Sequence, residues 1–431
     1  MSAERRSWRA PRGVRDVLPE EIPAWEALEA TARRLARLRG YREIRPALLE
    51  ETDLFTRSVG EVTDVVEKEM FSFQKGESSL SLRPEGTAGI VRAYLQAGYH
   101  KTAPVQRLYD VGPMFRYERP QKGRERMFTQ FDVETIGSLD PRLDAEIVHL
   151  AVCFFEELGI SGLEVRLNSM GDGEDRDHYR DAVRDYIGPR LDEYSADSRA
   201  RFERNVLRIL DSKAPQDVEL NRDAPRFVDY LSDENRVHFE TVQELLSGLG
   251  RTIVVDPSIV RGFDYYTRTV FEVHFPELGA RSALCGGGRY DHLVRDLGGP
   301  DLGAVGFAIG FTATLLVLEQ LGLSPGAGGE DRLRAEAYVV AAGEDLDQEV
   351  YRLAEELRRA GVSCVYDTER KSLKAQMKAA GRGGHRLALI LGPDELERSV
   401  VQLKDLAAGE QREVPRARVG AEALRELRAA P

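Results

Sequence analysis

Residues 261–267 place an arginine, an aspartate and two adjacent tyrosines directly before a run that reads as a buried strand. Arg261 carries a fixed positive charge, and Tyr265 and Tyr266 each offer a hydroxyl that can donate or accept a hydrogen bond. Polar side chains beside a buried strand are unfavourable unless they have partners. The segment therefore predicts a site for a small, aromatic and partly charged ligand.

A second group of candidates surrounds a charged loop between two strand-like runs. Arginine holds phosphate oxygens in a bidentate manner, and Arg116 stands at the start of the loop. Phe128, just after the loop, offers a face on which a nucleobase can stack. Gln130 and Glu134 follow at even spacing, so all three side chains share one face of the predicted strand. A charged hairpin with one inward face is the alternative interpretation.

Two shorter motifs are less specific. Glu85 and Thr87 put a carboxylate and a hydroxyl two residues apart, which can orient an ammonium group, although the Pro-Glu-Gly sequence is also typical of an ordinary turn. Three glycines at 286–288 lack the Gly-Lys-Ser/Thr ending of a phosphate-binding loop. They indicate instead that the backbone lies close to a ligand or to a neighbouring strand.

The spacing of apolar and turn residues indicates the elements that position these candidates. It predicts a helix over 22–39, antiparallel strands over 107–117 and 128–137, and a helical stretch over 171–245. The Pro- and Gly-rich run 324–332 is predicted to be a linker. Strands and helices alternate beyond it, as expected of a separate α/β domain of about 100 residues.

The composition, with 42% apolar and 31% charged residues, favours a soluble globular protein. We expect no membrane span and no signal peptide, and three distant cysteines favour a reducing cytoplasm without a disulfide framework. The net charge of −12 argues against non-specific nucleic-acid binding. The basic runs 116–126 and 370–386 still permit a specific nucleic-acid interface, and solvated surface charge is the alternative for each.

Taken together, the motifs resemble the histidyl-tRNA synthetase family of class II aminoacyl-tRNA synthetases over nearly the whole chain. Residues 115–134 are similar to the second class II motif, and 261–267 and 284–291 are similar to two histidyl-specific segments. Residues 12–19 and 44–46 are similar to the start of the family sequence and to its dimer-forming first motif.

The resemblance implies an α+β protein with a class II antiparallel-sheet catalytic core over 1–170 and 246–323. A helical insertion over 171–245 would interrupt the core. The linker 324–332 would lead to an α/β anticodon-binding domain over 333–431.

It also implies that the protein activates L-histidine with ATP and Mg²⁺ and transfers it to tRNA(His), as a cytoplasmic homodimer without a metal site built from protein side chains alone. Arg116 and Arg261 would be catalytic. The histidine-binding residues would be Glu85, Thr87, Gln130, Glu134, Tyr265 and Tyr266; the ATP-binding residues Arg116, Glu118 and Phe128; and the tRNA-binding residues Arg119, Lys122, Arg124, Arg370, Lys374 and Lys378.

One position departs from the family pattern. The third class II motif ends in an arginine over ATP, but the matching run 306–313 ends in Ala313, and no Lys or Arg occurs from Asp296 to Asp331. A paralogue that binds histidine without efficient charging, such as the regulatory subunit of a split ATP phosphoribosyltransferase, is therefore the alternative. A paralogue that serves another acceptor is a third possibility. The ligase is favoured, because that regulatory subunit normally lacks an anticodon-binding domain.

Overall fold

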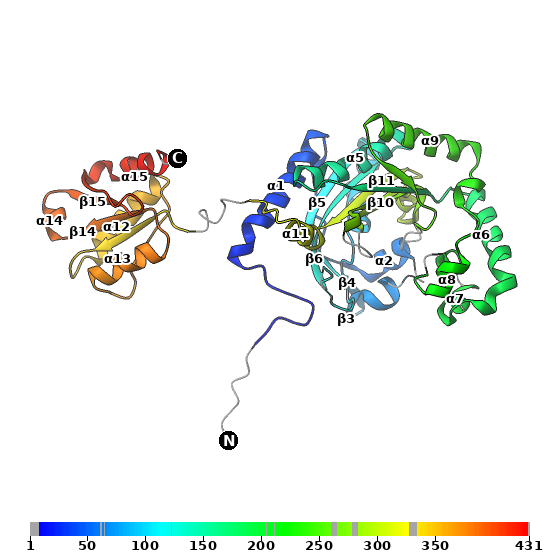
Figure 1. The fold of residues 1–431 in the computed structure, drawn as a ribbon, viewed down its shortest axis with the longest axis horizontal. Coiled ribbons are helices and arrows are strands. Elements are labelled where there is room, and N and C mark those ends of the chain that lie inside the picture. Colours follow the sequence, from blue (N-terminus) through cyan, green and yellow to red (C-terminus); the bar gives the residue numbers. More distant parts are fainter. Residues whose placement is uncertain are drawn as a thin grey trace, which may run out of the picture. The chain divides into compact units, whose positions relative to one another are not determined.

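The computed structural model describes residues 8–60, 63, 65–121, 123–203, 205–210, 212–259, 265–277, 283–326 and 334–429. The chain forms two compact units (Figure 1). One comprises Met1–Val17 and Ala24–Pro325, and the other comprises Leu18–Pro23 and Gly326–Pro431. Among the described residues, no helix combines the length and the apolar character that a membrane span requires.

An eight-stranded sheet in the order β1-β5-β6-β11-β10-β9-β7-β8 forms the centre of the first unit. The six inner strands pair antiparallel, and β1 and β8 add to the edges in parallel. The predicted antiparallel pair is confirmed as β5 and β6. The strands are β1 Arg42–Glu43, β5 Gln106–Phe115, β6 Met127–Ile136, β7 Glu164–Ser169, β8 Ile253–Val255, β9 Thr267–His274, β10 Ala283–Arg289 and β11 Ala304–Gly310.

The side chains of β6 alternate between the apolar core and the opposite face, which carries the predicted site residues Gln130 and Glu134. Phe131 packs on Phe307 of β11 and on Phe154, with ring centres 5.4 and 5.7 Å apart. Phe154 belongs to helix α5 Pro141–Glu157 and stacks on Phe311, the first residue of α11 Phe311–Gln320. Because side chains alternate between the two faces of a strand, the even-numbered residues of β6 face away from this apolar layer.

The predicted N-terminal helix is α1 Ile22–Leu38, and Gly40, with φ of +75°, follows its end. Its buried residues, Trp25, Leu28, Ala32 and Leu35, recur at the spacing of one helical face. A smaller sheet, β2-β4-β3, lies in the same unit. Its strands are β2 Leu49–Glu51, β3 Phe71–Lys75 and β4 Ser78–Leu82, and the nearby helices are α2 Thr52–Val59, α3 Thr87–Gln96 and α4 Tyr99–Thr102.

The described residues between 171 and 245 form helices and turns without a strand. Their α-helices are α6 Glu174–Ile187, α7 Ala196–Arg201, α8 Pro215–Leu220 and α9 Asp233–Gly248. A short helix, α10 Leu293–Asp296, follows β10. In Figure 1, α6, α7 and α8 lie together at one end of the first unit, and α9 leads back toward the sheet.

The second unit has a five-stranded sheet, β13-β12-β14-β15-β16, and an apolar core of its own. Strands β12, β13 and β14 are parallel, as is typical of strands joined by helices, whereas β15 and β16 complete the sheet as an antiparallel pair. The elements are β12 Ala337–Ala341, α12 Asp347–Arg359, β13 Cys364–Tyr366, α13 Leu373–Arg382, β14 Leu387–Leu391, α14 Pro393–Glu397, β15 Val400–Asp405, β16 Gln411–Pro415 and α15 Val419–Arg428.

Candidate active site

Glu134 lies at the centre of a buried polar cluster on the site face of β6, with 1% of its surface exposed. The Thr87 hydroxyl donates to one oxygen of the Glu134 carboxyl group over 2.6 Å, and the Tyr290 hydroxyl donates to the other. Burial raises the pKa of Glu134 to about 8, although both hydrogen bonds lower it. The group therefore exchanges its proton in the range in which an imidazole also titrates.

Three tyrosines form a cluster beside this carboxyl group. The rings of Tyr265 and Tyr266 lie 4.7 Å apart, and Tyr265 meets Tyr290 edge-on at 5.4 Å. Burial raises the pKa of Tyr265 and of Tyr290 well above the usual phenol value, so both hydroxyls stay protonated. The structure thus brings the two predicted tyrosines together with Tyr290, to which the sequence analysis gave no role.

Glycines in β10 and β11 leave the room that these side chains occupy. A Cβ atom at Gly306 would overlap the carboxyl group of Glu134, its partner across the strand pair. A Cβ atom at Gly288 would come within 2.9 Å of the Tyr266 ring. The close backbone approach expected at 286–288 is confirmed, because Gly287 lies against the main chain of Gly306.

Glu85 is fixed by the first turn of α3. Its carboxylate accepts hydrogen bonds from the main-chain N–H groups of Thr87 at 2.8 Å and Ala88 at 2.9 Å. Burial raises the pKa of Glu85 against these two bonds. The nearby Gln130 side chain has a buried Oε1 for which the described residues provide no hydrogen-bond donor. The region therefore offers acceptors to an ammonium group.

Asp132, between Gln130 and Glu134 on the same face of β6, is a polar residue that the sequence analysis missed. It is 1% exposed, and a Cβ atom added to Gly86 would come within 2.8 Å of its carboxyl carbon. Burial, together with the neighbouring carboxylates of Asp110 and Glu134, raises the pKa of Asp132 well above its usual range. The even spacing 130–132–134 is the signal that could have identified it.

The predicted ATP-binding residues also lie together, at the end of the β5–β6 hairpin. Arg116 donates from Nε to the main-chain oxygen of Pro84 over 2.8 Å, and its guanidinium lies 5.6 Å from the centre of the Phe128 ring. Glu118 lies 4.0 Å from Arg116 and forms a 2.9 Å ion pair with Arg124. The contact with Pro84 places this group beside the Glu85 turn.

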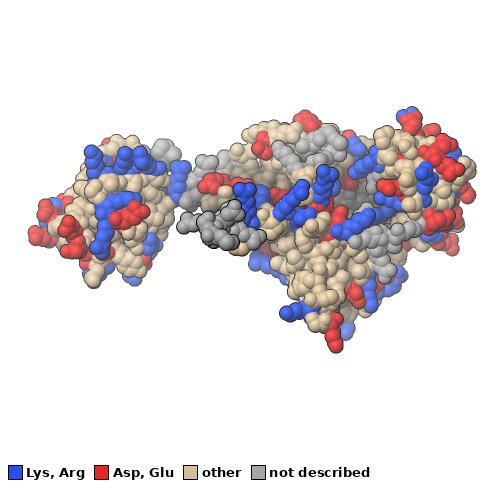
Figure 2. Space-filling view, turned by 90° about the horizontal axis from the view of Figure 1, so that it is seen from below, with Lys and Arg blue, Asp and Glu red and all other residues tan. Residues whose placement is uncertain are grey.

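The residues predicted to bind tRNA lie at the surface wherever the structure describes them. Arg119 and Arg124 are exposed in the β5–β6 loop, and Lys374 and Lys378 are exposed one helical turn apart on α13. Arg370 is exposed and pairs with Asp347. Figure 2 shows Lys and Arg side chains gathered in bands on both units despite the net negative charge.

Two predicted residues, Arg261 and Lys122, lie outside the described residues. Ala313 is in the first turn of α11 and is partly buried. The described residues contain no group of three or more His, Cys, Asp or Glu side chains that could hold a metal ion. The site as described therefore rests on hydrogen-bonding and charged groups from β6, the residues just before β9 and just after β10, the Glu85 turn and the β5–β6 loop.

The antiparallel sheet, with this cluster on one face and an arginine hairpin beside it, is the catalytic fold of a class II aminoacyl-tRNA synthetase. Residues 13–314 match the family model described as histidyl-tRNA synthetase, and 336–426 match an anticodon binding domain. The chain belongs to the histidyl-tRNA synthetase family.

Individual relatives agree with this membership. The histidine–tRNA ligase of Moorella thermoacetica is 47% identical over 411 residues, which cover 95% of this chain and 96% of that protein. The histidine–tRNA ligase of Natranaerobius thermophilus is 45% identical over 409 residues, with coverage of 94% and 96%. The crystal structure of apo S. aureus histidyl-tRNA synthetase matches with a TM-score of 0.80 and 32% identity, covering 96% of this chain and 99% of that one.

Proposed function

We propose that the protein is a histidine–tRNA ligase that activates L-histidine with ATP to histidyl-adenylate and transfers the histidyl group to tRNA(His) in the cytoplasm. The observation that carries the proposal is the buried carboxyl group of Glu134, which Thr87 and Tyr290 hold within a wall of tyrosines. An imidazole has two ring nitrogens that donate or accept, and such a pocket can satisfy both.

Each part of histidine has a counterpart in the site. Glu85 and Gln130 would accept hydrogen bonds from the ammonium group, with Thr87 beside them. Glu134 would bind one imidazole nitrogen, and the hydroxyl of Tyr266 would bind the other, with Tyr265 against the ring. Amino acids without the imidazole pattern would leave buried polar groups unpaired, which disfavours them strongly.

Activation would take place beside the β5–β6 hairpin. Phe128 would stack on adenine, and Arg116 would bind the α-phosphate, where charge develops as the histidine carboxylate attacks. Glu118 would complete the ATP-binding group, and Arg261 would approach the α-phosphate from the other side. Mg²⁺ binds oxygen ligands and retains waters, so it would be held mainly by the phosphates and would neutralise the departing pyrophosphate.

The exposed cations would bind the nucleic acid. Arg119, Lys122 and Arg124 of the hairpin loop would meet the acceptor end of the tRNA. In the second unit, Arg370 with the Lys374–Lys378 face of α13 would contact backbone phosphates near the anticodon. The anticodon-binding family match over 336–426 supports this assignment and makes the regulatory-subunit alternative the weaker hypothesis.

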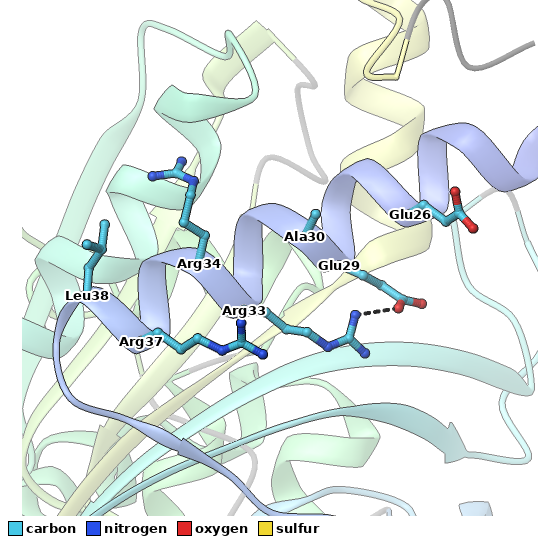
Figure 3. Close-up of a pocket in the computed structure, with 7 residues that line it drawn as sticks. All are labelled: Glu26, Glu29, Ala30, Arg33, Arg34, Arg37 and Leu38. Carbon is cyan, nitrogen blue, oxygen red and sulfur yellow. Dashed lines mark hydrogen bonds and ion pairs between the residues drawn. The ribbon is translucent and has the colours of Figure 1, made fainter. Parts of the chain in front are cut away.

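We also propose a homodimer that uses the region of α1 and residues 44–52. The outward face of α1 lines a shallow cleft of about 670 Å³ that carries both signs of charge (Figure 3). Arg33 pairs with Glu29 on this face, and Leu38 is 70% exposed. A face with alternating charges and an exposed leucine can pair with its own copy across a two-fold axis. A monomer in sedimentation at micromolar concentration would contradict this assignment.

The test is pyrophosphate exchange into ATP, which we expect to depend on histidine. Replacing Tyr290 with Phe removes one donor to Glu134, and should raise the KM for histidine by about 10- to 100-fold. The KM for ATP should stay within about twofold of wild type. The matched control is Tyr194→Phe in the helical insertion, which removes a buried hydroxyl bonded to Asn221 at 3.0 Å. A wild-type protein that binds histidine without exchange or tRNA charging would overturn the proposal.

A further inference from the structure

The β5–β6 loop is anchored to two other parts of the first unit. The main-chain N–H of Arg126 donates to the carbonyl oxygen of Gly13 over 2.6 Å, so the N-terminal segment lies along the loop. The neighbouring Glu125 accepts from Nε of Arg15 over 2.8 Å with one carboxylate oxygen. Its other oxygen accepts from the hydroxyl of Thr312 over 3.1 Å. A single carboxylate therefore joins the N-terminal segment, the loop and α11.

Arg15 is held from a second side by aromatic packing. Its guanidinium lies 5.9 Å from the Trp25 ring centre, and Trp25 lies 6.0 Å from the ring of Phe311, the first residue of α11. The side chain of Arg15 is 37% exposed and that of Glu125 is 19% exposed. Solvent therefore screens the pair only partly, so its geometry can matter to the loop.

Helix α11 supplies no positive charge of its own. It contains neither Lys nor Arg, and Ala313 stands directly after Thr312. Glu125 adds a negative charge to a loop that is proposed to bind a triphosphate, and a cation paired with Glu125 offsets that charge. Arg15 is the cation that pairs with Glu125.

We propose that Arg15 is a positioning residue of the nucleotide site. Through Glu125 and Thr312 it fastens the β5–β6 loop to the start of α11, and so holds Arg116 and Glu118 in place for ATP. The Arg15–Glu125–Thr312 link thus positions the ATP-binding loop in a chain that has alanine, and not a cation, at position 313. The inference rests on the proposed ATP-dependent activation of histidine.

The test compares Arg15→Ala, Arg15→Lys, Glu125→Gln and the Arg15→Ala/Glu125→Gln double variant. We expect both Arg15→Ala and Glu125→Gln to raise the KM for ATP about three- to fivefold, with the KM for histidine unchanged. Arg15→Lys should recover most of the loss. The double variant should be no worse than the poorer single variant, because both changes break the same link. ATP should also raise the thermal midpoint less in Arg15→Ala and Glu125→Gln than in wild type, and Arg15→Lys should recover most of that rise.

Arg166→Ala is the matched control. Arg166 lies on β7, away from the hairpin; its side chain is 34% exposed and pairs with Asp256 at 3.1 Å. It should leave both KM values unchanged. An unchanged ATP KM in Arg15→Ala and Glu125→Gln would overturn the inference, and so would equal rises in both KM values. If Arg15→Ala fails to fold, the isosteric Glu125→Gln carries the test. A wild-type protein that gains stability from ATP but shows no exchange would contradict the proposed function. The size of the ATP-induced rise in thermal midpoint in each variant would then decide the inference.

Discussion

Glu134 holds its proton at a pH at which an exposed glutamate is ionised, because the residue is buried between the sheet and three tyrosines. The ordinary pKa of a glutamate is 4.5, and folding raises the pKa of Glu134 to about 8. The folded protein therefore binds this proton more tightly than the unfolded chain does. The stability that Glu134 contributes is fully present below about pH 4.5 and is lost as the pH rises through about 8.

Glu134→Gln should reduce the pH dependence of stability. The amide keeps the shape of the side chain but does not titrate. We expect the thermal midpoint of the ligand-free variant to fall less than that of wild type between about pH 6 and pH 8.5. Glu244→Gln, on the exposed face of α9, is the control and should follow wild type. Parallel curves for Glu134→Gln and wild type would show that Glu134 does not retain the proton.

For single residues, the sequence was informative where the pattern is local. Gln130 and Glu134 could be predicted to share one face because even spacing within one strand needs no knowledge of the rest of the fold. Asp132 has the same spacing, but an aspartate in a charged hairpin is equally typical of solvent exposure, so its burial was not predicted. Tyr290 lies 156 residues from Glu134 in the chain, and its bond depends on how β10 is placed through β11 against β6.

At the scale of elements, β11 connects the site to the glycine-rich strand. Gly306 is paired with Glu134 and Gly310 with Gln130, so the two glycines can be compared within one strand. Gly306→Ala would drive a methyl group into the Glu134 carboxyl group, whereas a methyl group at Gly310 meets no atom of the described residues within 4 Å.

We therefore expect Gly306→Ala to lower the free energy of unfolding by about 1–3 kcal/mol, since overpacking a buried site forces its neighbours to move. The same variant should bind histidine more weakly. Gly310→Ala should change the free energy of unfolding by less than about 0.5 kcal/mol. Urea unfolding and calorimetric titration with histidine would measure both effects, and equal losses in the two variants would show that Glu134 does not need the space at 306.

The antiparallel end of the second unit was not predicted from the sequence. The alternation of strands and helices up to residue 391 predicts an α/β domain, and β12, β13 and β14 pair in parallel, as is typical of such a domain. Two further strands, β15 and β16, are joined by a short connection and pair antiparallel. No strand was predicted at β16, because it is short and largely polar, with a single buried residue, Val414.

At the scale of the molecule, the two units have separate apolar cores, so the loss of one should leave the other folded. Removing residues 327–431 should spare histidine-dependent pyrophosphate exchange within about threefold, because every proposed histidine and ATP contact lies in the first unit. Charging of tRNA(His) should fall by at least about tenfold through loss of the contacts near the anticodon. The two rates should be measured on one preparation. Equal losses would remove the assignment of this unit to tRNA binding.

The glycines behind Glu134 and Tyr266 also limit how the pocket can be redesigned. Glycine has no side chain to shorten, so no substitution at Gly288 or Gly306 enlarges the cavity on that side. A variant intended to accept a bulkier, ring-substituted histidine analogue must gain its space from the tyrosines opposite, beginning with Tyr265. Libraries that vary Gly288 and Gly306 would sample only smaller pockets.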